Sequence, residues 1–230
     1  MSTATPASRA SRPLLPLLML FAGAAAFSAI ALDITHHGPL ARADRALAPF
    51  LHAHANHWLI LLASACSGLG DIRILGPLAV AVGIFLLRRR QWRALVTWAA
   101  GLIGCTFLCG ILKSLFAIPR PSRFTLVPFD ADSGYTFPSG HTMGALVAAG
   151  LLALLWMRLK PRPRAHRLAA AALATLTGLL AAAALLYIGV HYLSDVLAGL
   201  ALSLAWLGVL RWMLPPAYDA TGVDERRPVP

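Results

Sequence analysis

The chain has 230 residues, of which 58% are hydrophobic and 13% charged, and its mean hydropathy is +0.70. Soluble domains carry about 25% charged residues, so this composition excludes an ordinary soluble domain and favours a helical integral membrane protein. The net charge of +11 does not indicate nucleic-acid binding, because the basic residues gather between apolar runs, as they do in cytoplasmic loops and beside anionic lipids.

Six apolar runs are long enough, or nearly so, to cross about 30 Å of hydrocarbon, which takes roughly 20 helical residues. They lie at 13–33, 72–87, 92–116, 142–157, 168–188 and 192–213. We therefore expect an all-α, polytopic membrane protein with one six-helix domain over residues 13–214. Residues 1–12 then form a cytoplasmic N-terminal segment, and the polar, Pro-containing residues 215–230 form a disordered cytoplasmic tail.

Residues 44–69 lie between the first two predicted spans. The first part mixes polar and apolar residues at helical spacing, and the apolar stretch 58–69 is too short to span alone. We expect a short interfacial helix followed by a lead-in to the second span. The first run also resembles a signal peptide, but its length of about 20 residues favours an uncleaved helix.

The basic residues orient the six-span model. With the N-terminus in the cytoplasm, 14 of the 20 Lys and Arg residues lie inside and 6 lie outside. This asymmetry follows the positive-inside rule, and treating 58–69 as a further crossing would reverse it. We therefore expect three polar clusters to share the outer side: "KSLFAIPRP" (113–121), "PSGH" (138–141) and "GVHYLSD" (189–195).

The first two clusters have the chemistry of a phosphate cradle. Lys113 and Arg120 supply positive charge, and the planar guanidinium of arginine suits phosphate oxygens. Ser139 is expected to cap the fourth span, and Gly140 lets a ligand approach the backbone. Free N–H groups at the start of a helix bind anions.

The third cluster has the chemistry of a nucleophile. His191 and Asp195 are four residues apart, so they share a helix face, and the carboxylate can fix the imidazole tautomer. The free ring nitrogen can then attack phosphorus, while His141 protonates the leaving oxygen. No acidic cluster suits magnesium, and we expect neither a metal nor a cofactor.

Other reactive residue types have structural interpretations. Cys66, Cys105 and Cys109 lie in apolar runs without metal-ligand spacing and are interpreted as small buried hydrophobes. The five histidines between 36 and 57 show no shared ligand geometry. Asp71 and Arg73 are expected to form a local pair at the mouth of the second span.

The three motifs together resemble the type 2 phosphatidic acid phosphatase superfamily, whose active-site plan is shared with vanadium haloperoxidases. The chain carries K-x6-R-P at 113–121, then P-S-G-H at 138–141, then H-x3-D at 191–195. The resemblance implies a six-span lipid phosphatase. It also implies a role for each motif residue: phosphate binding for Lys113, Arg120, Ser139 and Gly140, general acid for His141, covalent nucleophile for His191, and orientation of that nucleophile for Asp195.

One family position departs from the pattern. The third motif of the family begins with Ser-Arg, and these positions are Ala184 and Leu185 here. A missing charged hydrogen bond can cost several orders of magnitude in rate. Three explanations are open: Arg123 replaces the arginine; the enzyme is slow or suited to another phosphate group; or hydrolysis is lost and binding or transfer remains.

The expected partners are the bilayer and a phosphorylated lipid, with the active site on the outer, periplasmic face of a bacterial inner membrane. Undecaprenyl diphosphate, phosphatidate, phosphatidylglycerophosphate and lipid A phosphates are the candidate substrates. Two alternatives to hydrolysis remain: a phosphotransferase that uses the same phosphohistidine, and a non-catalytic binder of lipid phosphates.

Overall fold

The computed structural model describes residues 14–128, 134–159 and 162–214. All regular structure in these ranges is helical, and the predicted terminal segments 1–12 and 215–230 lie outside them. The α-helices are α1 (Leu14–Thr35), α2 (Pro39–Ala53), α3 (His57–Ser67), α4 (Ile72–Arg88), α5 (Trp92–Phe116), α6 (Gly140–Leu159), α7 (Arg164–Tyr187) and α8 (Leu193–Met213). Two single 3₁₀ turns complete the set, η2 (Gly68–Gly70) and η3 (Ser122–Phe124).

Six spans are confirmed by the length and apolar character of the helices. The candidate spans are α1, α3 with α4, α5, α6, α7 and α8, and the second runs from His57 to Arg88. The predicted fourth and fifth runs fall within α6 and α7, apart from Ile188, the residue that caps α7 at its C-terminal end. The all-α bundle predicted from hydropathy is therefore the observed architecture, and the protein is an integral membrane protein.

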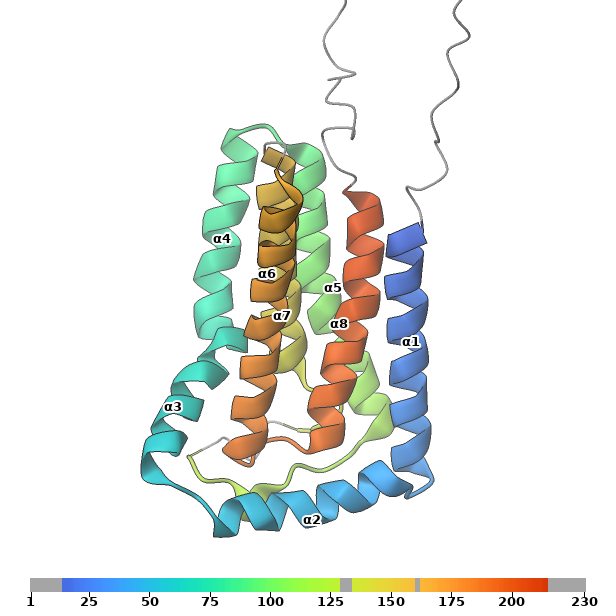
Figure 1. Ribbon diagram of the computed structural model, residues 1–230, viewed down its shortest axis with the longest axis vertical. Helices are drawn as coiled ribbons and strands as arrows, with labels where there is room; N and C mark the ends of the chain where they lie inside the picture. Colours follow the sequence, from blue (N-terminus) through green and yellow to red (C-terminus); the bar gives the residue numbers. More distant parts are fainter. Residues whose placement is uncertain (1–13, 129–133, 160–161, 215–230) are drawn as a thin grey trace, which may run out of the picture.

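The segment between the first two spans differs from its predicted boundaries. The expected interfacial helix is present as α2, but it begins at Pro39 and ends at Ala53, because Pro39 occupies the first turn and Asn56 caps the next helix. Residues 57–67 form a helix of their own, α3, which η2 separates from α4 within one span. Figure 1 shows α2 lying across one end of the bundle and α3 rising beside it.

Close backbone contact between α1 and α8 holds the two ends of the described chain together. A side chain at Gly23 would collide with the backbone of Ala201 and Ala205, so the small residue lets the two helices meet. Small residues have this role in membrane helix pairs, where apolar burial alone gives little drive. The first residues of α1 and the last of α8 lie at the end of the bundle opposite α2 (Figure 1).

The core of the bundle centres on α6, which packs against α5, α7 and α8. Met143, Val147 and Leu151 on α6 are fully buried against Trp98 of α5 and Leu210 of α8. Because α6 is held from several sides, its first residues have a defined position at the end of the bundle that α2 crosses. The polar clusters of the sequence gather at that end.

Candidate active site

A tight turn between α7 and α8 presents His191. Gly189 has a φ of +74°, and a side chain there would collide with the carbonyl of Phe124. Only glycine adopts this backbone conformation without strain in such close quarters. The Leu126 N–H donates to the Ile188 carbonyl at 2.9 Å, and the Thr125 hydroxyl donates to the Gly189 carbonyl at 3.1 Å. The loop after α5 therefore braces the turn that carries His191.

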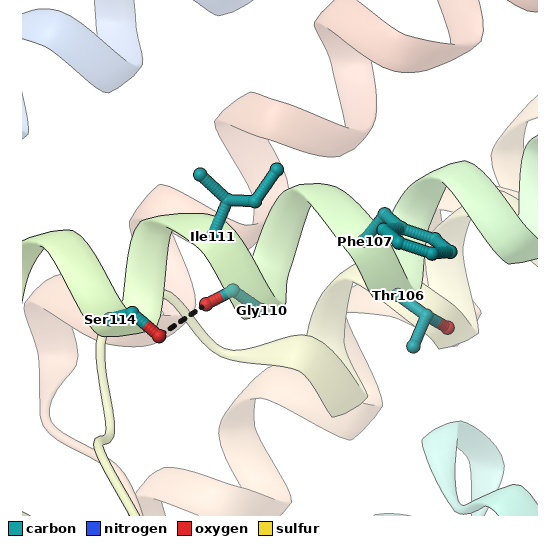
Figure 2. A pocket seen from close by; sticks show the side chains of 5 residues that line it. All are labelled: Thr106, Phe107, Gly110, Ile111 and Ser114. Carbon is teal, nitrogen blue, oxygen red and sulfur yellow. Dashed lines mark hydrogen bonds between the residues drawn. The ribbon is translucent and has the colours of Figure 1, made fainter.

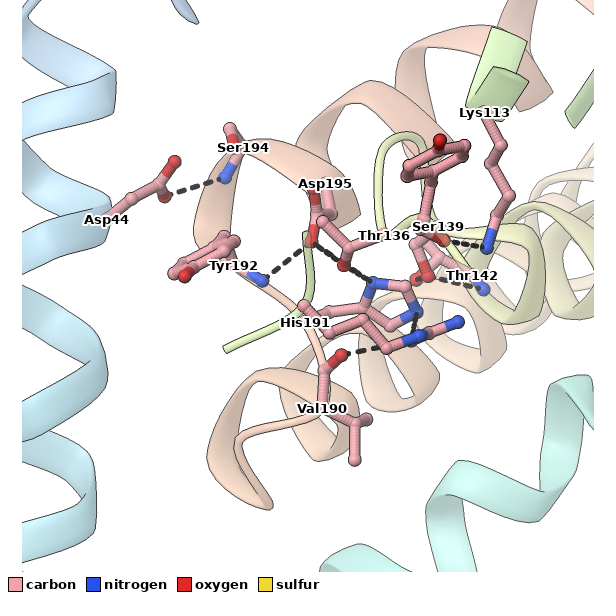
Figure 3. A network of polar contacts seen from close by, with 12 residues as sticks. Asp44, Lys113, Thr136, Ser139, Thr142, Val190, His191, Tyr192, Ser194 and Asp195 are labelled. Atoms are coloured by element: carbon pink, nitrogen blue, oxygen red, sulfur yellow. Dashed lines mark hydrogen bonds and ion pairs between the residues drawn. The ribbon is translucent and has the colours of Figure 1, made fainter. Parts of the chain in front are cut away.

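The imidazole of His191 is held on one side by two oxygen atoms. Its Nδ1 lies 3.1 Å from Asp195 Oδ2 and 2.9 Å from Thr136 Oγ1. The Thr136 hydroxyl donates to the same Asp195 oxygen, which also accepts the Tyr192 N–H at 2.8 Å. Figure 3 shows these groups converging, and the side chains of Thr136, His191 and Asp195 are fully buried. The acceptors favour the tautomer with hydrogen on Nδ1, which leaves Nε2 with its lone pair.

The lone pair of Nε2 faces a cation. Arg120 Nη1 lies 3.4 Å from His191 Nε2 and donates to the Val190 carbonyl at 3.1 Å. Lys113, near the end of α5, donates to the Tyr135 carbonyl at 2.8 Å. These two contacts hold a guanidinium and an ammonium at the same end of the bundle as the nucleophile candidate.

The start of α6 is tied directly to the start of α8. Ser139 caps α6 by accepting the Thr142 N–H at 3.3 Å and the Thr142 hydroxyl at 3.0 Å. The Ser139 backbone N–H donates to the Asp195 carbonyl at 3.0 Å. The predicted cap is therefore present, and "PSGH" and "GVHYLSD" meet through a backbone hydrogen bond. Gly140, the next residue, has ordinary space around it, since an added side chain would meet Cys109 at 3.9 Å.

His141 occupies the first turn of α6, two residues after the cap. Its Nε2 lies 4.0 Å from Asp71 Oδ2, and both side chains are 31% exposed. The expected pairing of Asp71 with Arg73 takes another form, because Asp71 Oδ1 accepts the backbone N–H of Arg73 at 2.7 Å and so caps α4.

Burial governs the protonation of His191. Removal from water lowers its pKa to about 4, against the opposing effect of the hydrogen bond and charge of Asp195. The positive charges of Arg120 and Lys113 act in the same direction as burial, and about 4 is the net result. At neutral pH the imidazole is uncharged, which is the state a nucleophile requires.

A second buried carboxylate supports the start of α8 from outside. Asp44 of α2 is 8% exposed, and its Oδ1 accepts the backbone N–H of Ser194 at 3.0 Å (Figure 3). Burial raises the pKa of Asp44 above its usual range, while its bonds to Ser194 act in the opposite direction. Helix α2 is thus attached to the residue that precedes Asp195.

Leu185, at the position of the arginine in the family motif, is surrounded by apolar side chains. Leu185 is 2% exposed and packs in a cluster with Ala63, Ala182 and Val196. Arg123 lies exposed in η3, and the contacts described for residues 14–128, 134–159 and 162–214 do not join it to His191. The structure therefore leaves the compensating role of Arg123 a prediction.

Metal-ligand types do not cluster in the described part of the chain. Within it, no group of three or more His, Cys, Asp or Glu side chains could hold one ion. The three cysteines are free. Cys105 and Cys109 are buried, as expected for small hydrophobes, whereas Cys66 is only partly buried.

A shallow hollow on the outside of α5 is separate from this polar network. It is lined by Thr106, Phe107, Gly110, Ile111 and Ser114 (Figure 2). An added side chain at Gly110 would meet nothing within 4 Å, and Phe107 and Ile111 are mostly exposed. The hollow is part of the apolar surface of a spanning helix and holds none of the predicted site residues.

The sequence analysis missed three polar contacts at this end of the bundle. It did not single out Thr136, which contacts His191, or Asp44, which contacts Ser194, and it paired Asp71 with Arg73 rather than with His141. A lone threonine two residues before Pro138 gives no signal of its own. The other two residues gave signals that could have been used. Asp44 lies inside a short amphipathic helix, and Asp71 follows the helix-breaking "SGLG" (67–70).

Comparison with known proteins agrees with this geometry. Residues 94–219 match the family model of the PAP2 superfamily. Phosphatidylglycerophosphatase B of Bacillus subtilis (strain 168) is 27% identical over 189 residues, which cover 80% of this chain and 87% of that protein. Lipid A 1-phosphatase of Rhizobium johnstonii is 37% identical over 112 residues, or 45% of this chain and 40% of that protein.

The fold has a counterpart among solved structures. The crystal structure of a transmembrane PAP2-type phosphatidylglycerolphosphate phosphatase from Bacillus subtilis matches with a TM-score of 0.71 and 24% identity, covering 86% of this chain and 94% of that one. Fold and site together define a six-span membrane protein with a buried His–Asp pair beside the guanidinium of Arg120. The chain belongs to the PAP2 superfamily.

Proposed function

We propose that this protein is a metal-independent membrane phosphatase that removes a phosphate group from a phosphorylated lipid through a phosphohistidine on His191. The observation that carries the proposal is the setting of the imidazole. Asp195 and Thr136 engage Nδ1, and Nε2 faces the guanidinium of Arg120 at 3.4 Å. A neutral, oriented nucleophile beside a cation is what attack on a phosphate requires.

The first step transfers the phosphoryl group to the protein. Nε2 of His191 forms a bond to phosphorus, the bond between phosphorus and the lipid oxygen breaks, and His141 gives a proton to that oxygen. Lys113 and Arg120 stabilise the charge on the remaining phosphate oxygens, together with the Ser139 side chain and the free N–H of Gly140 at the start of α6.

The second step restores the enzyme. A water molecule gives a proton to His141 and attacks phosphorus, the bond to Nε2 breaks, and inorganic phosphate leaves. Asp195 stays ionised throughout and balances the positive charge that the His191 ring carries while it is phosphorylated. Lys113 and Arg120 supply the positive charge that a metal supplies in other phosphatases, which supports metal independence.

Phosphatidylglycerophosphate is the substrate to test first. The relative named phosphatidylglycerophosphatase B covers most of this chain, whereas the similarity to lipid A 1-phosphatase covers less than half of it. A phosphate monoester on a glycerolipid places its charge at the headgroup level. We infer that the headgroup level reached by the site is the outer, periplasmic face of an inner membrane. The polar network lies at the end of the bundle that α2 crosses, and the arginine-rich turn between α4 and α5 (88–93) lies at the opposite end.

Phosphate release from a lipid panel tests the proposal. Purified protein in detergent with EDTA is given phosphatidylglycerophosphate, phosphatidate, undecaprenyl diphosphate and a lipid A phosphate. We expect release by the wild type and loss of about a thousandfold or more in His191→Ala, since the covalent nucleophile is removed. A His191→Ala protein as active as the wild type would contradict the proposed mechanism.

Labelled phosphate separates hydrolysis from the two alternatives. Label trapped on His191 after a quench without acid would rule out a purely binding protein. Label recovered in a second lipid when an acceptor alcohol is present would identify a phosphotransferase, and label recovered only as free phosphate would reject transfer.

A further inference from the structure

The break in the second span is packed against the start of α6. Turn η2 separates α3 from α4 and contacts α6. An added side chain at Gly70 would collide with the carbonyl oxygen of His141, so glycine is required for this approach. The close contact brings the next residue, Asp71, beside the His141 side chain.

Two different contacts fix the position of the Asp71 carboxylate. Oδ1 accepts the Arg73 N–H at 2.7 Å as the N-terminal cap of α4, and Oδ2 lies 4.0 Å from Nε2 of His141. The capping bond limits the rotation of the side chain, so the second oxygen is held near the imidazole. A distance of 4.0 Å is an ion-pair distance and too long for a hydrogen bond.

The charges around His141 oppose one another. A positive charge, such as that of Lys113 on α5 or Arg120 in the loop after α5, disfavours a nearby imidazolium. A carboxylate favours it, and Asp71 Oδ2 at the start of α4 lies 4.0 Å from the ring. A general acid must carry its proton before the leaving group departs. The same cations that bind phosphate therefore work against the proton donor, and Asp71 is the carboxylate that acts on the ring in the opposite sense.

We propose that Asp71 is a positioning residue that favours the protonated form of His141 and orients the ring for donation to the leaving oxygen. This inference rests on the proposed function. The site would then contain two histidine–carboxylate pairs with different tasks. Asp195 holds a fully buried, neutral His191, and Asp71 stabilises the charged form of a partly exposed His141.

The variant Asp71→Asn isolates the charge from the cap. Asparagine caps helices as well as aspartate does, so α4 keeps its first turn. We expect kcat/KM on a lipid phosphate to fall about tenfold at neutral pH. The basic limb of the pH–rate profile should move down by about one pH unit, since the partner charge lies at 4.0 Å and both side chains are 31% exposed.

A change of leaving group separates this role from a structural one. p-Nitrophenyl phosphate releases an acidic phenol that needs little protonation, so Asp71→Asn should lose much less activity on it than on the lipid. A merely structural defect would slow both substrates equally. Asp33→Asn is the matched control, because Asp33 accepts the Ala41 N–H at 3.0 Å near the same end of the bundle and has no described contact with His141. We expect wild-type rates and pH profile from it.

The titration of the His141 ring tests the inference apart from turnover. Carbon-13 histidine NMR on the detergent-solubilised protein, with His141→Gln used for assignment, should show its midpoint about one pH unit lower in Asp71→Asn. An unchanged midpoint, or equal losses on both substrates, overturns the inference. Absence of phosphate release by the wild type overturns the proposed function instead, and the NMR comparison still decides the role of Asp71.

Discussion

Replacing Thr136 by valine removes one hydroxyl from the contact between His191 and Asp195 while keeping the branched shape of the side chain. The hydroxyl donates to Asp195 Oδ2 and lies 2.9 Å from His191 Nδ1, in a fully buried position. After the change, Asp195 Oδ2 still accepts from His191 and from the Tyr192 N–H. The carboxylate therefore remains partnered, and the imidazole loses one of its two restraints.

The magnitude follows from the kind of bond that is lost. A buried hydrogen bond to a charged group contributes about 1.5–3 kcal/mol. If this energy is expressed in the transition state, kcat falls by about 10- to 150-fold. We expect KM to change little, because Thr136 contacts His191 and Asp195 and not Lys113 or Arg120, the cations proposed to bind phosphate.

The assay is phosphate release from a lipid substrate in detergent micelles, with the thermal midpoint measured alongside. Thr136→Ser is the matched control, since it keeps the hydroxyl and should retain kcat within about threefold of the wild type. Wild-type turnover in Thr136→Val would refute the reasoning. So would a serine variant as slow as the valine variant, because the hydroxyl would then be irrelevant.

Three further predictions concern charge. Leu185→Arg places an unpaired cation in the apolar cluster that contains Ala63, so we expect no gain in turnover and a thermal midpoint lower by about 5 °C or more. Leu185→Met is the control, because it keeps the position apolar. A tenfold gain in turnover of Leu185→Arg would contradict this expectation and show that the arginine of the family motif is a missing contact. Arg123→Ala should raise KM about two- to fivefold if the exposed guanidinium closes on bound phosphate. Arg45→Ala, which removes another exposed arginine, is the control. If both variants keep the KM of the wild type, Arg123 does not contact the bound phosphate. The pKa of histidine is near 6.5 in the unfolded chain, whereas that of the folded His191 is about 4. As the pH falls from 6.5 to 4, the unfolded state therefore binds a proton that the folded state does not, and the free energy of unfolding decreases by about 3 kcal/mol. His191→Asn should lack this part of the pH dependence of unfolding, and equal slopes for the two proteins would contradict the assigned burial.

Hydropathy and motif spacing predicted the features that depend on neighbours in the sequence. The six spans follow from runs of apolar residues, and the Ser139 cap and the His191–Asp195 contact follow from separations of three and four residues. The boundaries of α2 were harder to predict, because Pro39 starts this helix and Asn56 caps the start of the next one within a stretch of mixed polarity.

Contacts between distant segments depended on tertiary structure alone. Thr136 reaches Asp195 across 59 residues, and Asp44 reaches Ser194 across 150. No periodicity in the sequence encodes such separations, since they arise from the packing of α2, α6 and α8 at one end of the bundle.

The sequence by itself determined that the protein is a six-span helical membrane protein with lysine, arginine and two histidines arranged in three motifs. Only the tertiary structure decided how these groups are supported. It placed Thr136 beside His191, Asp71 beside His141, and Leu185 in an apolar cluster. The physical reason is that burial and orientation belong to the packed helices, whereas hydrophobicity and helix spacing are properties of the chain.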